Sequence, residues 1–270
     1  MARAAVVGAG LGGLTAAARL AHAGHQVDVF EQQDYAGGKA GSRSIGGYRF
    51  DTGPSLFTLP QVFRRVFQDV GEKLEDYLSL VPLEPICRYF YPDGTRLAGS
   101  SDPKRFGSEI EKNTMDTAAA LEAYLRHAGR VYDAAAELFL WHSLHEASSY
   151  LSRKGLRAVR RLGRIDMLRS LDRANRAFFA NPRTVQLFDR YATYNGSNPY
   201  RLPATFSIIP YIEYTFGGYA VEGGIYAVPQ ALHALGRNMG VRFHFGRRVE
   251  RILTVANGDM GFHCVFGRVK

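Results

Sequence analysis

The chain opens with a strand, a glycine-rich turn and a helix, and this opening limits the fold more than any other feature. "RAAVVGAG" is a short apolar run that ends in glycine, which is typical of a buried parallel strand. The turn has the spacing Gly8-x-Gly10-x-x-Gly13, and the alanine-rich stretch after it stops at Gly24. "HQVDVFE" alternates and indicates a second strand, which ends at Glu31. The pattern predicts a βαβ unit with a parallel sheet, and therefore an α/β fold of the Rossmann type.

Each residue of this opening has a task in a dinucleotide site. Gly8 allows the tight turn, Gly10 lets the backbone approach a pyrophosphate, and Gly13 lets the helix pack close to the strand. The helix N-terminus offers free N–H groups and positive potential to the phosphates. Glu31 follows Gly13 by eighteen residues, and its carboxylate would accept the hydroxyls of the adenosine ribose. A 2′-phosphate would be repelled there, which disfavours NADP.

A second glycine pair follows the acidic residue and distinguishes between the remaining cofactors. The stretch "VVGAGLGGLTAAARLAHAGHQVDVFEQQDYAGGKAGS" resembles the FAD-binding start of the amine oxidase and phytoene desaturase superfamily. In that group a GG followed by Arg or Lys comes shortly after the acid, and Gly37-Gly38-Lys39 fits this pattern. Two glycines permit a close crossing of the longer cofactor, and Lys39 can offset phosphate charge. The resemblance therefore implies FAD rather than NAD.

Two further segments resemble one branch of that superfamily. "YRFDTGPSLFTLPQVF" looks like the FDxGPS segment of bacterial carotenoid desaturases, where it lies near the flavin ring. "FGGYAVEGGIYAVPQALHALGRNMGVRFHFGRRVERI" is similar to a later helix and strand, and the resemblance implies that Val249 lies against the adenine. The cofactor-binding residues expected from the motif and the resemblance together are Gly8, Ala9, Gly10, Gly12, Gly13, Glu31, Gly37, Gly38, Lys39, Gly53, Pro54 and Val249.

The resemblance implies a phytoene desaturase type carotenoid dehydrogenase, which would introduce carbon–carbon double bonds into phytoene or a hydroxycarotenoid with FAD. In such a reaction the flavin takes the hydride equivalent and the protein supplies placement and a dry tunnel. No Ser-His-Asp or Cys-His arrangement is evident, so no catalytic residue is assigned. Asp51 either sits near the flavin or stabilises a turn. Another flavin oxidoreductase of the superfamily, such as an amine oxidase, is the weaker alternative.

The middle of the chain differs in character from its two ends, because it is helical, aromatic and basic. We expect a discontinuous FAD-binding domain over 1–55 and 215–270, and an inserted, mainly helical substrate domain over 56–214. Within the insert, "ICRYFYPDGTRLAG" predicts a hairpin and Pro103 an early helix position. The glycine-rich stretch from Gly37 to Gly53 is expected to be a loop. Prolines 199, 203 and 210 are expected to break the chain into loops or extended segments.

The charge of the chain gathers in one stretch of the predicted insert. The net charge is +9, and residues 153–176 hold nine Lys or Arg against two Asp. With apolar residues between the charges, this stretch either lies on an anionic membrane surface, where a carotenoid would be found, or is a solvated face. No nucleic-acid module is evident, so nucleic acid is not an expected partner. No signal peptide or transmembrane run is seen, and we expect a cytoplasmic protein that is peripheral at the inner face of the membrane.

Metal and disulfide chemistry are not expected. His142, His145 and Glu146 fall on one helical face but lack an evident fourth ligand. Cys87 and Cys264 are far apart in the sequence and are expected to be reduced.

The resemblance fades after Leu253, and family members are considerably longer. We therefore expect a chain truncated at its C-terminus, which encodes the adenosine and pyrophosphate half of the FAD site and not the half around the flavin ring. Such a chain should leave a sheet edge and apolar surface exposed. One hypothesis is then a carotenoid desaturase or its N-terminal part. The other is a catalytically inert flavin-binding remnant that becomes active only with a complementing chain; the oligomeric state is left open.

Overall fold

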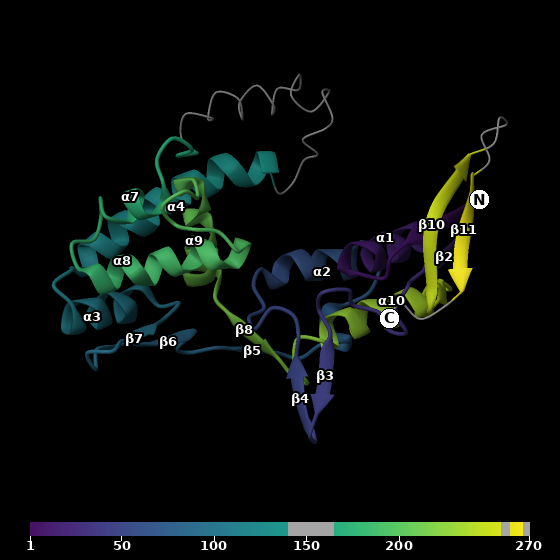
Figure 1. Cartoon of the computed structure of the whole chain (residues 1–270), viewed down its shortest axis with the longest axis horizontal. Coiled ribbons are helices and arrows are strands. Elements are labelled where there is room, and N and C mark those ends of the chain that lie inside the picture. Colours follow the sequence, from purple (N-terminus) through teal and green to yellow (C-terminus); the bar gives the residue numbers. More distant parts are fainter. Residues whose placement is uncertain (140–164, 255–259, 267–270) are drawn as a thin grey trace. The chain divides into compact units, whose positions relative to one another are not determined.

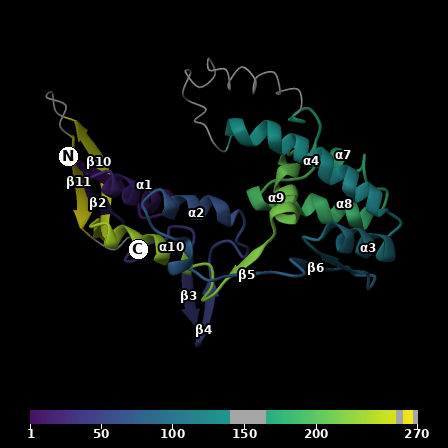
Figure 2. The same cartoon turned by 180° about the vertical axis from the view of Figure 1, so that it is seen from behind.

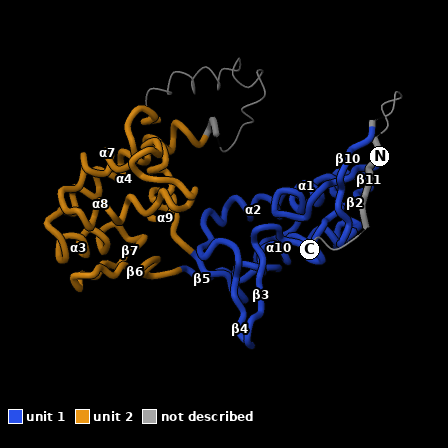
Figure 3. The backbone as a smooth tube through the Cα atoms, viewed as in Figure 1, with its two compact units in different colours: residues 1–82, 219–270 blue, residues 83–218 orange. Residues whose placement is uncertain are grey.

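A computed structural model of the chain describes residues 1–139, 165–254 and 260–266. The chain forms two compact units, shown in Figure 3: unit 1 comprises Met1–Pro82 and Tyr219–Lys270, and unit 2 comprises Leu83–Gly218. Unit 2 is thus an insert within unit 1, and the chain passes between them twice. The boundary differs from the expected one, because residues 56–82 belong to unit 1. Phe67, Val70 and Leu74 from this stretch are buried in the same core as Leu14 and Val29.

Unit 1 begins with the βαβ arrangement that the glycine spacing predicts. The elements are β1 (Arg3–Val7), α1 (Leu11–His22) and β2 (Gln26–Phe30). β1 and β2 are parallel, with Ala4 opposite Val27 and Val6 opposite Val29, and β9 (Arg242–His244) adds a third parallel strand beside β2. The order is β1-β2-β9, so β1 lies at an edge of the described sheet.

One face of this sheet is covered by helices from both ends of the chain. α1 lies against α10 (Ala227–Asn238) in both views (Figure 1 and Figure 2). The small, fully buried Ala17 and Ala18 of α1 allow close helix packing, and Leu232 and Leu235 of α10 are fully buried with them. α2 (Pro60–Gln68) and the short helix η1 (Leu74–Asp76) extend this core. Apolar burial of this kind is the main source of stability for the unit.

The described residues also form antiparallel strand pairs, and one of these pairs differs from the sequence expectation. β3 (Ser42–Ile45) and β4 (Tyr48–Asp51) form a hairpin in the stretch that was expected to be a loop. Its turn is Gly46-Gly47, with φ of 59° and 82°, the left-handed backbone that a two-residue hairpin turn with the correct twist requires. The glycines were noticed, but the short strands "SRSI" and "YRFD" carry little strand signal. The other pairs are β5 (Leu80–Pro82) with β8 (Tyr219–Val221), β10 (Arg247–Thr254) with β11 (Met260–Phe266), and β6 with β7 in unit 2.

Unit 2 is mainly helical, as expected. The predicted hairpin is β6 (Cys87–Phe90) and β7 (Arg96–Gly99), and α3 (Pro103–Asn113) starts at an Asp102 cap whose side chain accepts the amide of Lys104. The remaining elements are α4 (Ala118–Phe139), α7 (Leu171–Asn175), α8 (Pro182–Asp189), η3 (Arg190–Asn195), η4 (Ala204–Ser207) and α9 (Ile208–Phe216). Their core is aromatic, with Phe106, Tyr124, Phe188 and Tyr214 fully buried.

The expectation that prolines break the chain after residue 199 is wrong at one position. Pro210 lies inside α9, at its third residue. The first turn of a helix has N–H groups without helical partners, so a proline there removes no hydrogen bond. The described residues contain no helix that is both long and apolar enough to span a bilayer. Two sequence features lie outside the described residues: the group of His142, His145 and Glu146, and the first part of the basic stretch 153–176.

Candidate cofactor site

Two glycines of the turn after β1 are required by the fold of unit 1 itself. Gly8 has a φ of 95°, in the left-handed region that other residues rarely adopt. A Cβ on Gly13 would lie 2.0 Å from the carbonyl oxygen of Gly8, so only glycine lets α1 start this close to β1. These two residues would be needed even if nothing were bound here.

The other two glycines of the turn are not required by the protein's own packing. A Cβ on Gly10 or Gly12 would meet no atom within 4 Å, and neither residue has a positive φ. Inside the helix, glycine at position 12 also lowers helix stability relative to alanine. Open space beside two such glycines is therefore best explained by a ligand that approaches the backbone closely, as a pyrophosphate does.

The N-terminus of α1 is free to receive a negative group. Its N-cap residue is Gly10, which has no side chain, and the first turn contains no acidic residue. The first N–H groups of a helix have no partner inside it and carry a partial positive charge. An anion such as a phosphate is stabilised at this position.

Glu31 holds the turn in place from the end of β2. It is buried, with one carboxylate oxygen 2.7 Å from the backbone nitrogen of Ala9 and the other 2.9 Å from that of Gln33. A carboxylate can accept about four hydrogen bonds, so both oxygens keep lone pairs for a ribose. The predicted role in binding ribose stays a prediction. The role in fixing the loop was not foreseen from the sequence.

The second glycine pair lies directly beside the first turn. The amide of Gly37 donates to the carbonyl of Ala9 over 2.8 Å, and Gly37 forms an isolated bridge with Gly10. A Cβ on Gly37 would lie 2.4 Å from the carbonyl oxygen of Ala40, and one on Gly38 would lie 3.4 Å from the Cα of Gly10. The structure thus brings together two segments that are far apart in the motif.

The rest of the predicted set continues from this pair. A Cβ on Gly53 would lie 2.8 Å from the Cα of Ala40, so the segment after β4 packs against the loop that holds Lys39. The side chains of Lys39 and Pro54 are exposed. Val249 lies farther along, half-buried on β10, the strand whose first residue donates its amide to the carbonyl of Glu31 over 2.8 Å. Backbone contacts therefore link all the predicted segments within unit 1.

Asp51 stabilises a turn, which was one of the two roles expected for it, and its expected position near the flavin stays a prediction. One oxygen of its carboxylate accepts the amide of Ile225 over 2.9 Å, just before α10. Gly224 lies against Asp51, because a Cβ there would be 2.5 Å from the carboxylate. Asp51 thus stabilises the Gly223-Gly224 turn and ties β4 to α10.

The face of the sheet opposite α1 carries a charged cluster that the sequence did not predict. The Asp28 carboxylate accepts hydrogen bonds from Arg242 over 2.6 Å and lies 2.7 Å from Nε2 of His244. Burial by itself would raise the pKa of Asp28, but the hydrogen bonds from Arg242 and His244 outweigh it and hold the pKa below its usual value. The cluster joins β2 to β9, both of which lead into the site.

Unit 2 contains a second, separate polar network. Glu213 is fully buried on α9 and accepts the hydroxyls of Tyr191 and Tyr194 over 2.7 and 2.9 Å. The Arg190 guanidinium lies 3.7 Å from the same carboxylate, and over the rings of Tyr89, Tyr191 and Tyr194. Burial raises the pKa of Tyr194 to about 12, so its hydroxyl stays protonated and can donate. The sequence pattern "FDRYATY" gives no periodic signal from which to foresee this arrangement.

The geometry of unit 1 fits a cofactor with two phosphates and a ribose. The open space at Gly10 and Gly12, the free N-terminus of α1 and the buried Glu31 carboxylate supply the three features that such a molecule needs. Among the described residues, no group of His, Cys, Asp and Glu is arranged to hold a metal ion.

Comparison with known proteins identifies the class to which this fold and site belong. Residues 11–270 match the model of the flavin-containing amine oxidoreductases, and the chain belongs to that family. This membership confirms the α/β fold with an inserted unit and the prediction of FAD. The match runs through residue 270, so the expectation that the resemblance ends near Leu253 is wrong.

The most informative relatives all act on carotenoids. The chain is 39% identical to a 1-hydroxycarotenoid 3,4-desaturase of Flavobacterium sp. (strain P99-3), over 93% of this chain and 51% of the relative. It is 34% identical to a zeta-carotene-forming phytoene desaturase of Myxococcus xanthus, over 99% and 51%. These relatives confirm the resemblance to phytoene desaturase type carotenoid dehydrogenases. The chain spans about half the length of the curated relatives it matches.

Solved structures show the same fold at low sequence identity. A protein of Pyrococcus furiosus matches with a TM-score of 0.59 and 17% identity, over 97% of this chain and 57% of that one. A triple mutant of putrescine oxidase matches with a TM-score of 0.59 and 16% identity, over 97% and 55%. At this level of identity the matches establish the fold alone.

Proposed function

We propose that the chain provides the cofactor-binding part of an FAD-dependent carotenoid desaturase. The proposal rests above all on the two glycines, Gly10 and Gly12, that face open space at the start of α1. The carotenoid relatives support the substrate class, and the 1-hydroxycarotenoid 3,4-desaturase supports a hydroxylated carotenoid in particular. FAD, when bound, accepts the two hydrogens that desaturation removes.

The residues of unit 1 would act by holding and orienting the cofactor. The free N–H groups of α1 would receive the pyrophosphate, and Glu31 would accept the ribose hydroxyls. Gly37 and Gly38 would let the cofactor pass the loop closely, and exposed Lys39 would offset phosphate charge. Val249, on the strand that begins beside Glu31, would pack against the adenine. No residue is assigned to the chemistry at the polyene.

A second candidate function is flavin binding without turnover by this chain alone. The observation that favours it is the length of the relatives, of which the chain spans about half. If residues around the flavin ring come from the other half of such a protein, the site in unit 1 would hold FAD but would not complete a catalytic centre. The two candidates share the cofactor and differ in turnover.

We further propose that the protein is peripheral at the inner face of the membrane, which it meets through the basic stretch 153–176. The described part of this stretch contains an apolar tip: Met167 is 57% exposed and Leu168 is fully exposed. Apolar side chains that project between basic ones suit the boundary between lipid headgroups and acyl chains. Arg173 is exposed nearby and would face anionic lipid.

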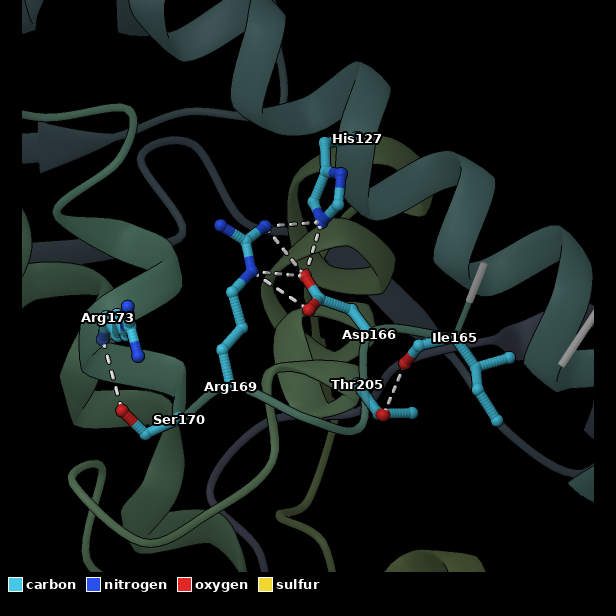
Figure 4. Close-up of polar contacts among 7 residues, drawn as sticks. All are labelled: His127, Ile165, Asp166, Arg169, Ser170, Arg173 and Thr205. Carbon is cyan, nitrogen blue, oxygen red and sulfur yellow. Dashed lines mark hydrogen bonds and ion pairs between the residues drawn. The ribbon is translucent and has the colours of Figure 1, made fainter. Parts of the chain in front are cut away.

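The loop that carries this apolar tip is firmly attached to unit 2, as Figure 4 shows. Asp166 accepts hydrogen bonds from Nε and Nη2 of Arg169 and lies 2.9 Å from Nε2 of His127 on α4. Thr205 binds the carbonyl of Ile165 through its hydroxyl and that of Asp166 through its amide. Both ends of the loop are therefore held, and the exposure of Leu168 is a property of an ordered loop. This supports a contact that is built into the surface.

The cofactor proposal is tested by purifying the 270-residue chain with FAD and recording the flavin absorbance of the protein fraction. The chain is then assayed with a 1-hydroxycarotenoid and with phytoene in vesicles that contain anionic lipid. Bound FAD with conversion supports the desaturase. Bound FAD without conversion favours the second candidate. A protein fraction with no flavin would overturn both.

The membrane proposal has its own test. Sedimentation with anionic vesicles should retain the chain, and Leu168→Asp should lower the bound fraction, while Leu168→Met should not. Equal binding of all three proteins would contradict the proposed contact.

A further inference from the structure

The second glycine pair packs against the start of α10, which comes much later in the sequence. Gly37 is buried, and a Cβ on it would lie 3.1 Å from a side-chain carbon of Pro229 and 3.3 Å from a ring carbon of Tyr226. Tyr226 directly precedes α10, and Pro229 is buried in its first turn. The position of the loop 37–41, the second glycine loop, therefore depends on these two side chains.

Gly37 also contacts the turn after β1. Its amide donates to the carbonyl of Ala9 over 2.8 Å, and a Cβ on the neighbouring Gly38 would lie 3.4 Å from the Cα of Gly10. Gly10 is the N-cap of α1, where the pyrophosphate is proposed to bind. Gly37 thus links the ring of Tyr226 to the glycine turn after β1. Because protein interiors are close-packed and transmit displacements, removing the ring should let the second glycine loop move away from this turn.

Two contacts fix the ring of Tyr226 within unit 1. The preceding residue, Ile225, donates its amide to the carboxylate of Asp51 over 2.9 Å. The ring of Tyr35 lies edge-on to that of Tyr226, with 6.2 Å between the ring centroids and 80° between the planes, an arrangement that is favourable for aromatic pairs. Tyr35 also packs on the loop, because a Cβ on Gly41 would lie 3.5 Å from its ring. One aromatic pair therefore contacts both ends of the second glycine loop.

We propose that Tyr226 is a positioning residue for the cofactor, because its ring sets the distance between the second glycine loop and the glycine turn after β1. The affinity for FAD depends on that distance, and Tyr226 acts on it through Gly37. A site that already has its binding geometry binds more tightly, because less conformational freedom is lost on binding. The effect on FAD rests on the proposed function, whereas the position of the loop can be measured in the free chain.

The ring of Tyr226, and not its hydroxyl, makes the contacts on which this role depends. Ring atoms contact Gly37 and Tyr35, whereas the hydroxyl has no hydrogen-bond partner among the residues that the structure describes. Tyr226→Phe therefore keeps both contacts. Tyr226→Ala removes them and leaves space beside Gly37, into which the loop can move. The two variants separate the role of the ring from that of the hydroxyl.

Two measurements on the full chain test the role of Tyr226. The first is hydrogen exchange of the Gly37 amide in the free chain, which reports how well its bond to the carbonyl of Ala9 is kept. The second is the dissociation constant for FAD, from a titration followed by flavin fluorescence. We expect Tyr226→Ala to speed exchange at Gly37 and to raise the dissociation constant, each by about tenfold or more. Tyr226→Phe should stay within about twofold of the parent in both measurements.

Tyr77→Ala is the matched control for a general loss of stability. Tyr77 is likewise a half-buried tyrosine of unit 1: its ring centroid lies 5.1 Å from that of Phe67, and its hydroxyl accepts from Asn238 over 3.0 Å. Asn238 is the last residue of α10, at the opposite end of the helix from Tyr226. Tyr77→Ala should lower the free energy of unfolding in urea as Tyr226→Ala does, yet leave exchange at Gly37 and FAD binding at the level of the parent.

The positioning role would be overturned by unchanged exchange at Gly37 in Tyr226→Ala, or by faster exchange with unchanged FAD binding. Equal effects of Tyr226→Ala and either Tyr77→Ala or Tyr226→Phe would overturn it too. A parent that binds no FAD would overturn the proposed function and the effect on FAD with it, while exchange at Gly37 would still decide whether Tyr226 holds the loop. If the alanine variant does not fold, Tyr226→Leu fills part of the space and should shift both measurements in the same direction by less.

Discussion

The backbone amide of Ala9 donates a 2.7 Å hydrogen bond to the carboxylate of Glu31, so the residue that follows β2 fixes the turn that follows β1. Glu31 therefore has a structural role in the protein that does not depend on a bound ribose. A buried carboxylate that accepts two backbone amides makes strong, charge-assisted bonds. The shape of the cofactor loop therefore depends on the side chain that is also predicted to bind the ribose.

Replacing this acid should weaken both the fold and cofactor binding. Glu31→Gln turns one acceptor oxygen into a donor that faces a backbone N–H group, and we expect a loss of about 1–3 kcal/mol in the free energy of unfolding. Urea unfolding without cofactor measures it. Gln33→Ala is the control, because it alters an exposed side chain and keeps the backbone amide that Glu31 accepts. Equal stability of Glu31→Gln and the parent would contradict the role of Glu31 in holding the loop.

Adjacent glycines in α1 should respond to alanine in opposite ways. Gly12→Ala places its Cβ in open space and improves helix propensity. Without cofactor, its free energy of unfolding should equal that of the parent or exceed it by up to about 1 kcal/mol, and its thermal midpoint should be unchanged or higher. Gly13→Ala forces a contact of 2.0 Å with the carbonyl of Gly8 and should destabilise the fold.

Flavin binding separates these two variants further. We expect Gly12→Ala to be folded and to lose FAD, which the ratio of flavin to protein absorbance measures. A Gly12→Ala protein that retains FAD at the level of the parent would show that the cofactor does not pass close to this residue.

The buried carboxylate of unit 2 should be important for stability. Glu213→Leu leaves the Arg190 guanidinium and the hydroxyls of Tyr191 and Tyr194 without their acceptor, and we expect a loss of about 3–5 kcal/mol. Glu213→Gln keeps an acceptor and should lose less. Urea unfolding of both variants measures the difference. A Glu213→Leu protein with the same free energy of unfolding as the parent would indicate that packing compensates fully for the lost polar contacts.

Asp189 should make the stability depend on pH in the opposite sense to most acids. Burial raises the pKa of Asp189 to about 6, and the neighbouring Asp172 adds to the rise, although a hydrogen bond from Asn175 opposes it. The folded state then holds this proton more tightly than the unfolded state does. The contribution of Asp189 is fully present below about pH 4 and is lost as the pH rises through about 6.

The comparison of the parent with Asp189→Asn isolates this effect. The asparagine cannot ionise, so its stability relative to the parent should increase between pH 4 and 7. Asp28 and Asp166 have lowered pKa values, and their contributions are lost only as the pH falls below about 4. A difference between parent and variant that is constant from pH 4 to 7 would contradict the raised pKa.

The parts of the site that follow a local rule could be predicted from the sequence. Gly8, Gly13 and Glu31 have fixed spacing in a βαβ unit, and the structure places them as that spacing requires. The start of α3 was predicted from Pro103, which acts within the first turn of the helix.

The parts that depend on distant contacts could not be predicted. The tie between Asp51 and Ile225 joins residues 174 positions apart, and no pattern in either segment indicates it. The Glu213 network joins β6, η3 and α9 through side chains that have no common periodicity. The boundary at Pro82 was missed for a related reason: α2 has the pattern of an amphipathic helix, and that pattern does not say which core its apolar side meets.

The inserted position of unit 2 has a consequence for how the protein is made. The core of unit 1 needs α10, which packs against α1 although more than 200 residues separate the two helices. On a ribosome that adds about 5–20 residues per second, β1 and α1 emerge roughly ten seconds or more before the helix that covers them. During that interval the core of unit 1 lacks α10 and holds only the early elements up to η1, whereas unit 2 is continuous in sequence and can fold as soon as it leaves the ribosome. A growing chain of this kind is a natural client for a chaperone that binds early apolar segments.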